Sequence, residues 1–137
     1  MEGYSGTPLA KKLGIKDGFT ILLVNVPDYY KSLFRDFPLN TKEVKRPKAE
    51  TVNFAHVFCT TEKDLKTYLP KLKPALKKDG MLWVSWPKGA SKIETTINRE
   101  AVRDYVLSKI GLVDIKVAAI DADWSGLKFV YRKEDRK

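Results

Sequence analysis

A chain of 137 residues, 43% hydrophobic and 11% aromatic, fits one globular domain and excludes a disordered chain. Its 26 basic and 17 acidic side chains leave a net charge of +9, which suits an anionic partner, but a solvated lysine coat gives the same total and is the interpretation we favour. The single cysteine, Cys59, and the single histidine exclude an internal disulfide and argue against a zinc or iron site.

The sequence has no apolar run as long as a membrane span, and its first six residues lack the basic and apolar parts of a signal peptide. We therefore expect a cytoplasmic protein without a membrane partner. We also expect one domain over residues 1–137. It consists of an N-terminal extension (1–18), an α/β core (19–132) and a charged, frayed tail (133–137).

Thr7, Pro8 and Gly14 predict a short first helix, as its cap, first helical residue and exit. The stretch Ser5-Gly6-Thr7 could also cradle a phosphate through backbone amides, but an ordinary cap is the better interpretation.

Residues 19–26 are rich in β-branched and aliphatic side chains and predict the first strand. A helix over about 28–34 follows, with Tyr29 and Leu33 facing the sheet. The proline-punctuated stretch 37–50 is a connection, in which a short edge strand near residues 43–45 is an option.

Residues 52–59 predict a second strand, and Thr60-Thr61-Glu62 supplies the cap of the next helix. Pro70 and Pro74 remove hydrogen bonds inside that helix, so we expect a kink or two short pieces. The run 80–87 is apolar on both alternations, as in the middle strand of a sheet covered on both faces.

Asn98 caps a last helix that runs to about Ile110, with Gly111 beyond its end. Two alternating segments, 113–119 and 127–131, predict an antiparallel hairpin. The fold class is therefore a three-layer, Rossmann-like α/β domain, with a mostly parallel sheet of about five strands and an antiparallel C-terminal hairpin.

This order of elements resembles the second half of a class I methyltransferase, whose sheet also ends in such a hairpin. The segment 52–58 looks like the fourth strand of that family, and the lysine-proline, glycine and strand residues of 72–84 look like its fifth.

The cofactor turn departs from that family. The resemblance implies a glycine-rich turn after the first strand for S-adenosylmethionine, whereas Asn25-Val26-Pro27-Asp28 has no glycine, and its proline lacks an amide donor. The second and third strands, with the acidic residue that holds the ribose, are reduced to the connection 37–50. We therefore expect no cofactor.

A second resemblance spans nearly the whole chain. The stretches Tyr4–Leu9, Lys12–Ile15, Met81–Lys88 and Trp124–Lys128 are similar to those of a family of small bacterial proteins of uncharacterised activity. This resemblance implies a fold and a bacterial cytoplasmic setting, and no activity.

Ligands of open α/β sheets bind outside the carboxyl ends of the parallel strands, where several loops of this chain should meet. The side chains predicted to bind a ligand there are Asn25, Thr60, Ser85, Trp86, Lys88, Asp121, Asp123, Trp124 and Ser125. They could supply hydrogen bonds, stacking and one cation. For each residue taken alone, a capping, turn or packing role is the interpretation we favour.

His56 lies inside a strand and is better read as a core residue than as a general base. Cys59, three residues on, points to the opposite face, so the two do not form a nucleophile pair. No catalytic residue can be assigned.

Three functions remain open. The first is a binding or interaction module that has lost the cofactor turn, and the sequence leans towards this and away from an enzyme. The second is an enzyme acting on a nucleotide-like or other anionic small molecule. The third is a nucleic-acid binder that uses the lysines of residues 42–48 and 63–78, although no RNA-binding or recognition-helix pattern accompanies them.

Overall fold

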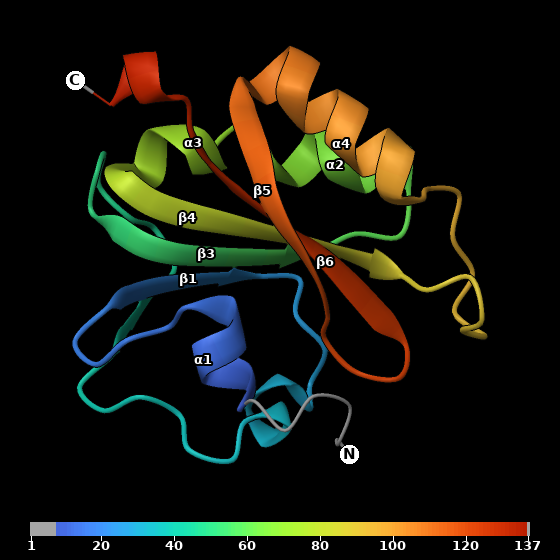
Figure 1. Cartoon of the computed structure of the whole chain (residues 1–137), viewed down its shortest axis with the longest axis horizontal. Helices are drawn as coiled ribbons and strands as arrows, with labels where there is room; N and C mark the ends of the chain where they lie inside the picture. The colour runs from blue at the N-terminus through green and yellow to red at the C-terminus, as the bar shows by residue number, and fades with distance from the viewer. Residues whose placement is uncertain (1–7, 137) are drawn as a thin grey trace.

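The computed structural model describes residues 8–136, which contain one six-stranded sheet in the order β2-β1-β3-β4-β6-β5 (Figure 1). The strands are β1 (Thr20–Val24), β2 (Lys42–Val44), β3 (Val52–Phe58), β4 (Leu76–Pro87), β5 (Leu112–Ala119) and β6 (Trp124–Tyr131). β1 to β4 are mutually parallel, and β6 runs antiparallel to both β4 and β5. The predicted fold class is confirmed, with one strand more than the five expected.

Helices cover both faces of the sheet, which gives three layers (Figure 1). They are α1 (Leu9–Leu13), α2 (Glu62–Tyr68), α3 (Leu72–Ala75) and α4 (Arg99–Tyr105), with 3-10 turns η1 (Tyr30–Leu33) and η3 (Lys133–Asp135) and a π-helical turn η2 (Val106–Ile110). One hydrophobic cluster packs under α2, α3 and α4, and the other lies beneath α1 and η1. We call these the α2–α4 face and the α1 face.

The middle strand, β4, begins four residues before the predicted start, at Leu76 instead of Gly80. Its pairing with β3 shifts register between Val52 and Phe54, so the backbone bends there. A Cβ on Gly80 would lie 2.8 Å from the carbonyl oxygen of Val52, so the close approach requires glycine. From Leu82 onward every side chain of β4 is buried, as the sequence predicts.

The segment predicted to be a helix over 28–34 is only the four-residue turn η1. Its tighter 3-10 winding turns Tyr30 inward, to 2% exposure, and leaves Tyr29 at 42%, so the prediction that Tyr29 faces the sheet is wrong. The edge strand β2 does form, held by its parallel pairing with β1.

Helix α1 ends at Gly14 as predicted, but it begins at Leu9, so Pro8 is its N-cap instead of its first helical residue. The boundaries of the later helices follow their predicted signals. The long helix is split into α2 and α3, and Thr61 caps α2 by accepting the N–H of Asp64. Asn98 caps α4 through Ala101 N–H, and Gly111, at φ 86°, ends η2. The predicted cap Thr7 and the possible phosphate cradle Ser5-Gly6-Thr7 lie outside the described residues.

Candidate functional site

The carboxyl ends of the parallel strands meet at one edge of the sheet, where hydrogen bonds join their loops. The Asn25 side-chain amide donates to the carbonyl of Phe58 at 2.8 Å, which ties β1 to β3. Cys59 N–H donates to the Ser85 carbonyl at 2.9 Å, and Lys88 N–H to the Asp123 carbonyl at 2.8 Å. The predicted gathering of polar loops at this edge is therefore present.

Most of the predicted polar side chains at this edge hold their own loops or join neighbouring ones. The N–H and hydroxyl of Thr60 both donate to the Asp64 carboxylate, at 2.9 and 3.2 Å. Asp121 accepts two backbone N–H groups of its own turn at 2.8 Å each. Asp123 accepts the hydroxyl of Ser91 at 3.1 Å. These contacts are the capping and turn roles weighed in the sequence.

Ser85 lies in the interior, at 0% exposure, instead of at the accessible edge. Its Oγ is 2.8 Å from His56 Nε2, and His56 Nδ1 is 2.9 Å from the hydroxyl of Tyr30. Burial lowers the pKa of His56 from 6.5 to about 3 and raises the pKa of Tyr30, so both stay neutral. A neutral imidazole has one donor and one acceptor nitrogen, which two hydroxyls satisfy. The arrangement is a packing network without access to substrate.

Cys59 has no part in that network. It belongs to the core of the α2–α4 face, whereas the ring neighbours of His56, such as Phe58 and Trp83, belong to the α1 face. Burial, with a smaller contribution from Asp64, raises the pKa of the Cys59 thiol to about 12. A buried thiol that stays protonated is a poor nucleophile.

The two indoles predicted to stack on a ligand pack into opposite faces of the sheet. Trp86 is 6% exposed in the α2–α4 face, and Trp124 is 7% exposed in the α1 face. The Trp124 Nε1–H donates to the hydroxyl of Tyr29 at 3.2 Å. Lys88 and Ser125 are half-buried, and Ser125 pairs with Trp86 across the β4–β6 ladder. The two tryptophans therefore cannot clamp one ring between them.

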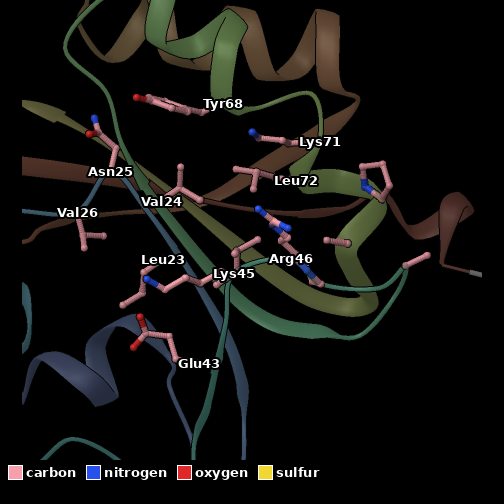
Figure 2. A pocket seen from close by; sticks show the side chains of 15 residues that line it. Leu23, Val24, Asn25, Val26, Glu43, Lys45, Arg46, Tyr68, Lys71 and Leu72 are labelled. Carbon is pink, nitrogen blue, oxygen red and sulfur yellow. The ribbon is translucent and has the colours of Figure 1, made fainter.

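A groove of about 750 Å³ lies beside this edge, at the carboxyl ends of β1 and β2 (Figure 2). Its floor is apolar and comes from Leu22 and Val24 of β1. One wall belongs to the α2–α3 segment, and the other to the chain after β2. Those walls are lined by Tyr68, Lys71, Leu72, Pro74 and Ala75, and by Lys45, Arg46, Pro47 and Ala49. We call it the β1–β2 groove.

The rim of the β1–β2 groove is positively charged. Lys45, Arg46 and Lys71 lie around its opening, and all three are exposed (Figure 2). Glu43 also lines it, but its carboxylate is 3.3 Å from the ammonium of Lys31. An apolar floor with a cationic rim favours a ligand that carries both apolar surface and negative charge.

The groove exists because no further element covers this side of the sheet within residues 8–136. β2 is an edge strand, and on the helical side the groove is lined by Tyr68 and by Lys71, Leu72, Pro74 and Ala75. Of the nine predicted site residues only Asn25 lines it. The other residues that line the groove were not predicted from the sequence, because a strand face that no element covers has no local sequence pattern. The available signal was the missing strand after residues 42–44.

The turn after β1 has a geometry of its own. Asn25 adopts φ 54°, the left-handed region that favours glycine, and its amide is used by Phe58. Pro27 follows, and its carbonyl accepts the N–H of Tyr30 to start η1. β2 ends at Val44, and the residue after it is Lys45; the carboxylate at this end is Glu43, inside the strand, which lines the β1–β2 groove.

The same residues 8–136 contain no group of three His, Cys, Asp or Glu side chains placed to hold a metal ion. No helix in that range is both long and apolar enough to cross a membrane.

The strand order and the hairpin define a methyltransferase-like, Rossmann-like fold. Scans against models of protein families and against curated proteins found no match to this sequence.

Solved structures do match. A putative type 11 methyltransferase from Sulfolobus solfataricus is similar, with a TM-score of 0.59 and 13% identity over 93% of this chain and 91% of that one. A TehB-like SAM-dependent methyltransferase from Corynebacterium glutamicum has a TM-score of 0.57 and 13% identity, over 95% and 90% of the two chains. One chain of the complex between the Haloferax volcanii Trm112 methyltransferase activator and a putative methyltransferase is similar, with a TM-score of 0.55 and 11% identity over 89% of this chain and 86% of that one. At these identities the likeness shows the fold alone.

Proposed function

We propose that this domain is a binding module on a methyltransferase-like fold, and that it does not use S-adenosylmethionine. The observation that carries the proposal is the turn after β1. Asn25 adopts the left-handed conformation, and its side-chain amide donates a hydrogen bond to the Phe58 carbonyl. Pro27 has no N–H, and the only helical element that follows directly is the four-residue turn η1. A cofactor that needs close backbone approach and a helix N-terminus finds neither here.

The β1–β2 groove is the binding surface of the proposed module. Its occupant is an acidic, partly apolar segment of another protein, because the floor is aliphatic and the rim carries Lys45, Arg46 and Lys71. No acidic side chain within residues 8–136 forms an ion pair with these three cations, so they attract a negative partner and repel a positive one. A fold of this kind also occurs in a complex between a methyltransferase activator and a putative methyltransferase, which supports a role in protein contacts.

A second function stays open at the same groove: an enzyme acting on a nucleotide-like or other anionic small molecule. Tyr68 beside the cations of the rim favours it, since an aromatic ring and basic groups suit a base and a phosphate.

We further propose that the chain belongs to the family of small bacterial proteins that it resembles, and that it works in the cytoplasm. The stretches Tyr4–Leu9 and Met81–Lys88 support this membership.

The binding module and the enzyme are distinguished by the ligands that each should bind. Thermal unfolding with S-adenosylmethionine, S-adenosylhomocysteine, AMP and ATP should show no shift for the module, whereas AMP or ATP should raise Tm for the enzyme. A labelled ten-residue peptide of alternating leucine and glutamate should bind the module, and a leucine–lysine peptide should not.

Variants connect the binding to the groove. The double variant Lys45→Gln/Arg46→Gln should lose the acidic peptide, whereas the charge-matched control Lys63→Gln/Lys109→Gln, at two exposed helical positions outside the groove, should keep it. Micromolar binding of S-adenosylmethionine, or equal loss in both variants, would refute the proposal.

A further inference from the structure

Two lysines lie directly opposite each other on the last two strands. In the antiparallel β5–β6 pair, Lys116 is the register partner of Lys128. Both side chains are on the α1 face. The Lys116 ammonium donates to the carbonyl of Lys12 at 2.9 Å, and the Lys128 ammonium lies 3.6 Å from the position a Cβ on Gly14 would take. Like charges directly opposite on one face of a sheet are destabilising.

Helix α1 adds a third positive charge, Lys12, near Lys116. The Lys12 ammonium donates to the Ala119 carbonyl of β5 at 3.1 Å, so it is fixed over the strand pair. Burial, followed by the charges of Lys116 and Lys88, lowers the pKa of Lys12. Burial, followed by Lys116 and Lys16, lowers the pKa of Lys128. We call Lys12, Lys116 and Lys128 the lysine cluster.

Nothing within residues 8–136 neutralises this charge. None of the Asp and Glu side chains of that range forms an ion pair or hydrogen bond with the lysine cluster. Asp114, two residues before Lys116, is instead paired with Arg103 at 3.1 Å on the α2–α4 face. The fold therefore places the Lys116 ammonium near both Lys12 and Lys128, at a cost in stability that an anion would remove.

We propose that the lysine cluster is a binding site for a diphosphate group. Lys116 is the register partner of Lys128, and its charge acts on both Lys12 and Lys128, so a compact ligand with several negative charges fits these ammonium groups better than a single carboxylate does. Each ammonium has three donors, and the one bond to a main-chain carbonyl made by Lys12 and by Lys116 leaves two on each for phosphate oxygens. Its lysines come from α1, β5 and β6, whereas the β1–β2 groove is lined from β1, β2, the chain after β2 and the α2–α3 segment, so the site does not depend on the function proposed for the groove.

The test uses pyrophosphate as the probe, by calorimetry at constant ionic strength. The variant Lys128→Gln removes one ammonium that makes no hydrogen bond within residues 8–136, so it should fold. It should weaken pyrophosphate binding by about tenfold, the loss of roughly one charge-assisted contact. Without pyrophosphate, its Tm should exceed that of the wild type, because the cross-strand repulsion is gone. The charge change is matched by Lys63→Gln, which should bind as the wild type does.

A second measurement is independent of stability. In spectra of ¹³Cε-labelled lysine, pyrophosphate should raise the pKa of Lys12 and Lys128 and leave Lys63 unmoved. Absence of a binding isotherm, or equal weakening by Lys63→Gln, overturns the proposal as non-specific attraction to a basic surface. Binding of a labelled single-stranded RNA through the same lysines without binding of pyrophosphate overturns it in favour of a nucleic-acid surface.

Discussion

The middle of the sheet and its β1–β2 edge are built from similar apolar strands but differ in how they are covered. In β3 and the second half of β4, side chains are buried on both faces because helices lie on both sides. In β1, Ile21 is buried on the α1 face, whereas Val24 is half-exposed in the floor of the β1–β2 groove. Apolar surface left open in this way has a stability cost, and such surfaces mark binding sites. Similar apolar strand residues therefore form the hydrophobic core in the middle of the sheet and the floor of a candidate binding site at its β1–β2 edge.

The largest test of this contrast is Trp83→Ala against Val24→Ala. Trp83 is fully buried, and its Nε1–H donates to the Leu13 carbonyl at 2.8 Å, so its truncation should cost about 3–5 kcal/mol of unfolding free energy. Val24→Ala should cost about 1 kcal/mol or less, because the groove already exposes part of that side chain. Urea unfolding followed by circular dichroism measures both. Equal costs would mean that the groove floor is packed core.

Acid should weaken the middle of the sheet through His56. Its pKa is about 3 in the folded protein and 6.5 unfolded, so between these values only the unfolded chain binds the proton, and stability falls as pH falls. From pH 7 to pH 5 the loss should be about 2 kcal/mol. Urea unfolding at both pH values measures it. His56→Gln, which keeps a donor and an acceptor, should lack this dependence; the same slope in the variant would assign it to other groups.

Two glycines test close packing at the β3–β4 register shift. Gly80→Ala places a Cβ 2.8 Å from the carbonyl of Val52 and should cost about 1–3 kcal/mol. Gly89→Ala is the control, since nothing lies within 4 Å of the added carbon, and should change stability by less than about 0.5 kcal/mol. Chemical unfolding of the two variants side by side decides the point; a tolerated Gly80→Ala would show that the bend relaxes easily.

The difference between centre and edge also explains what could be predicted from the sequence. The apolar run 80–87 and the alternating hairpin have strong local patterns, so the middle of the sheet was predictable. β2 is three mostly polar residues held by β1, a contact without a local pattern. Because the carboxyl ends of parallel strands meet at one edge of a sheet, the sequence predicted which loops gather there. It could not show that Ser85 turns inward to His56 on the neighbouring strand, because that depends on register. The β1–β2 groove results from an element that is missing after residues 42–44, and the residues that line the groove carry no local pattern that marks them.

The smallest expected effect on stability is at the rim of the groove. Lys45 and Arg46 are exposed, and within residues 8–136 no ion pair or hydrogen bond holds either side chain. Lys45→Gln/Arg46→Gln should therefore change the unfolding free energy by no more than about 0.5 kcal/mol, the same as Lys63→Gln/Lys109→Gln. Urea unfolding of both pairs gives the comparison. A loss above about 1 kcal/mol confined to the rim pair would mean that their aliphatic stems cover Leu22 and Val24 as part of the core. The edge would then be closed by its own side chains, and a ligand would have to displace them before reaching the floor.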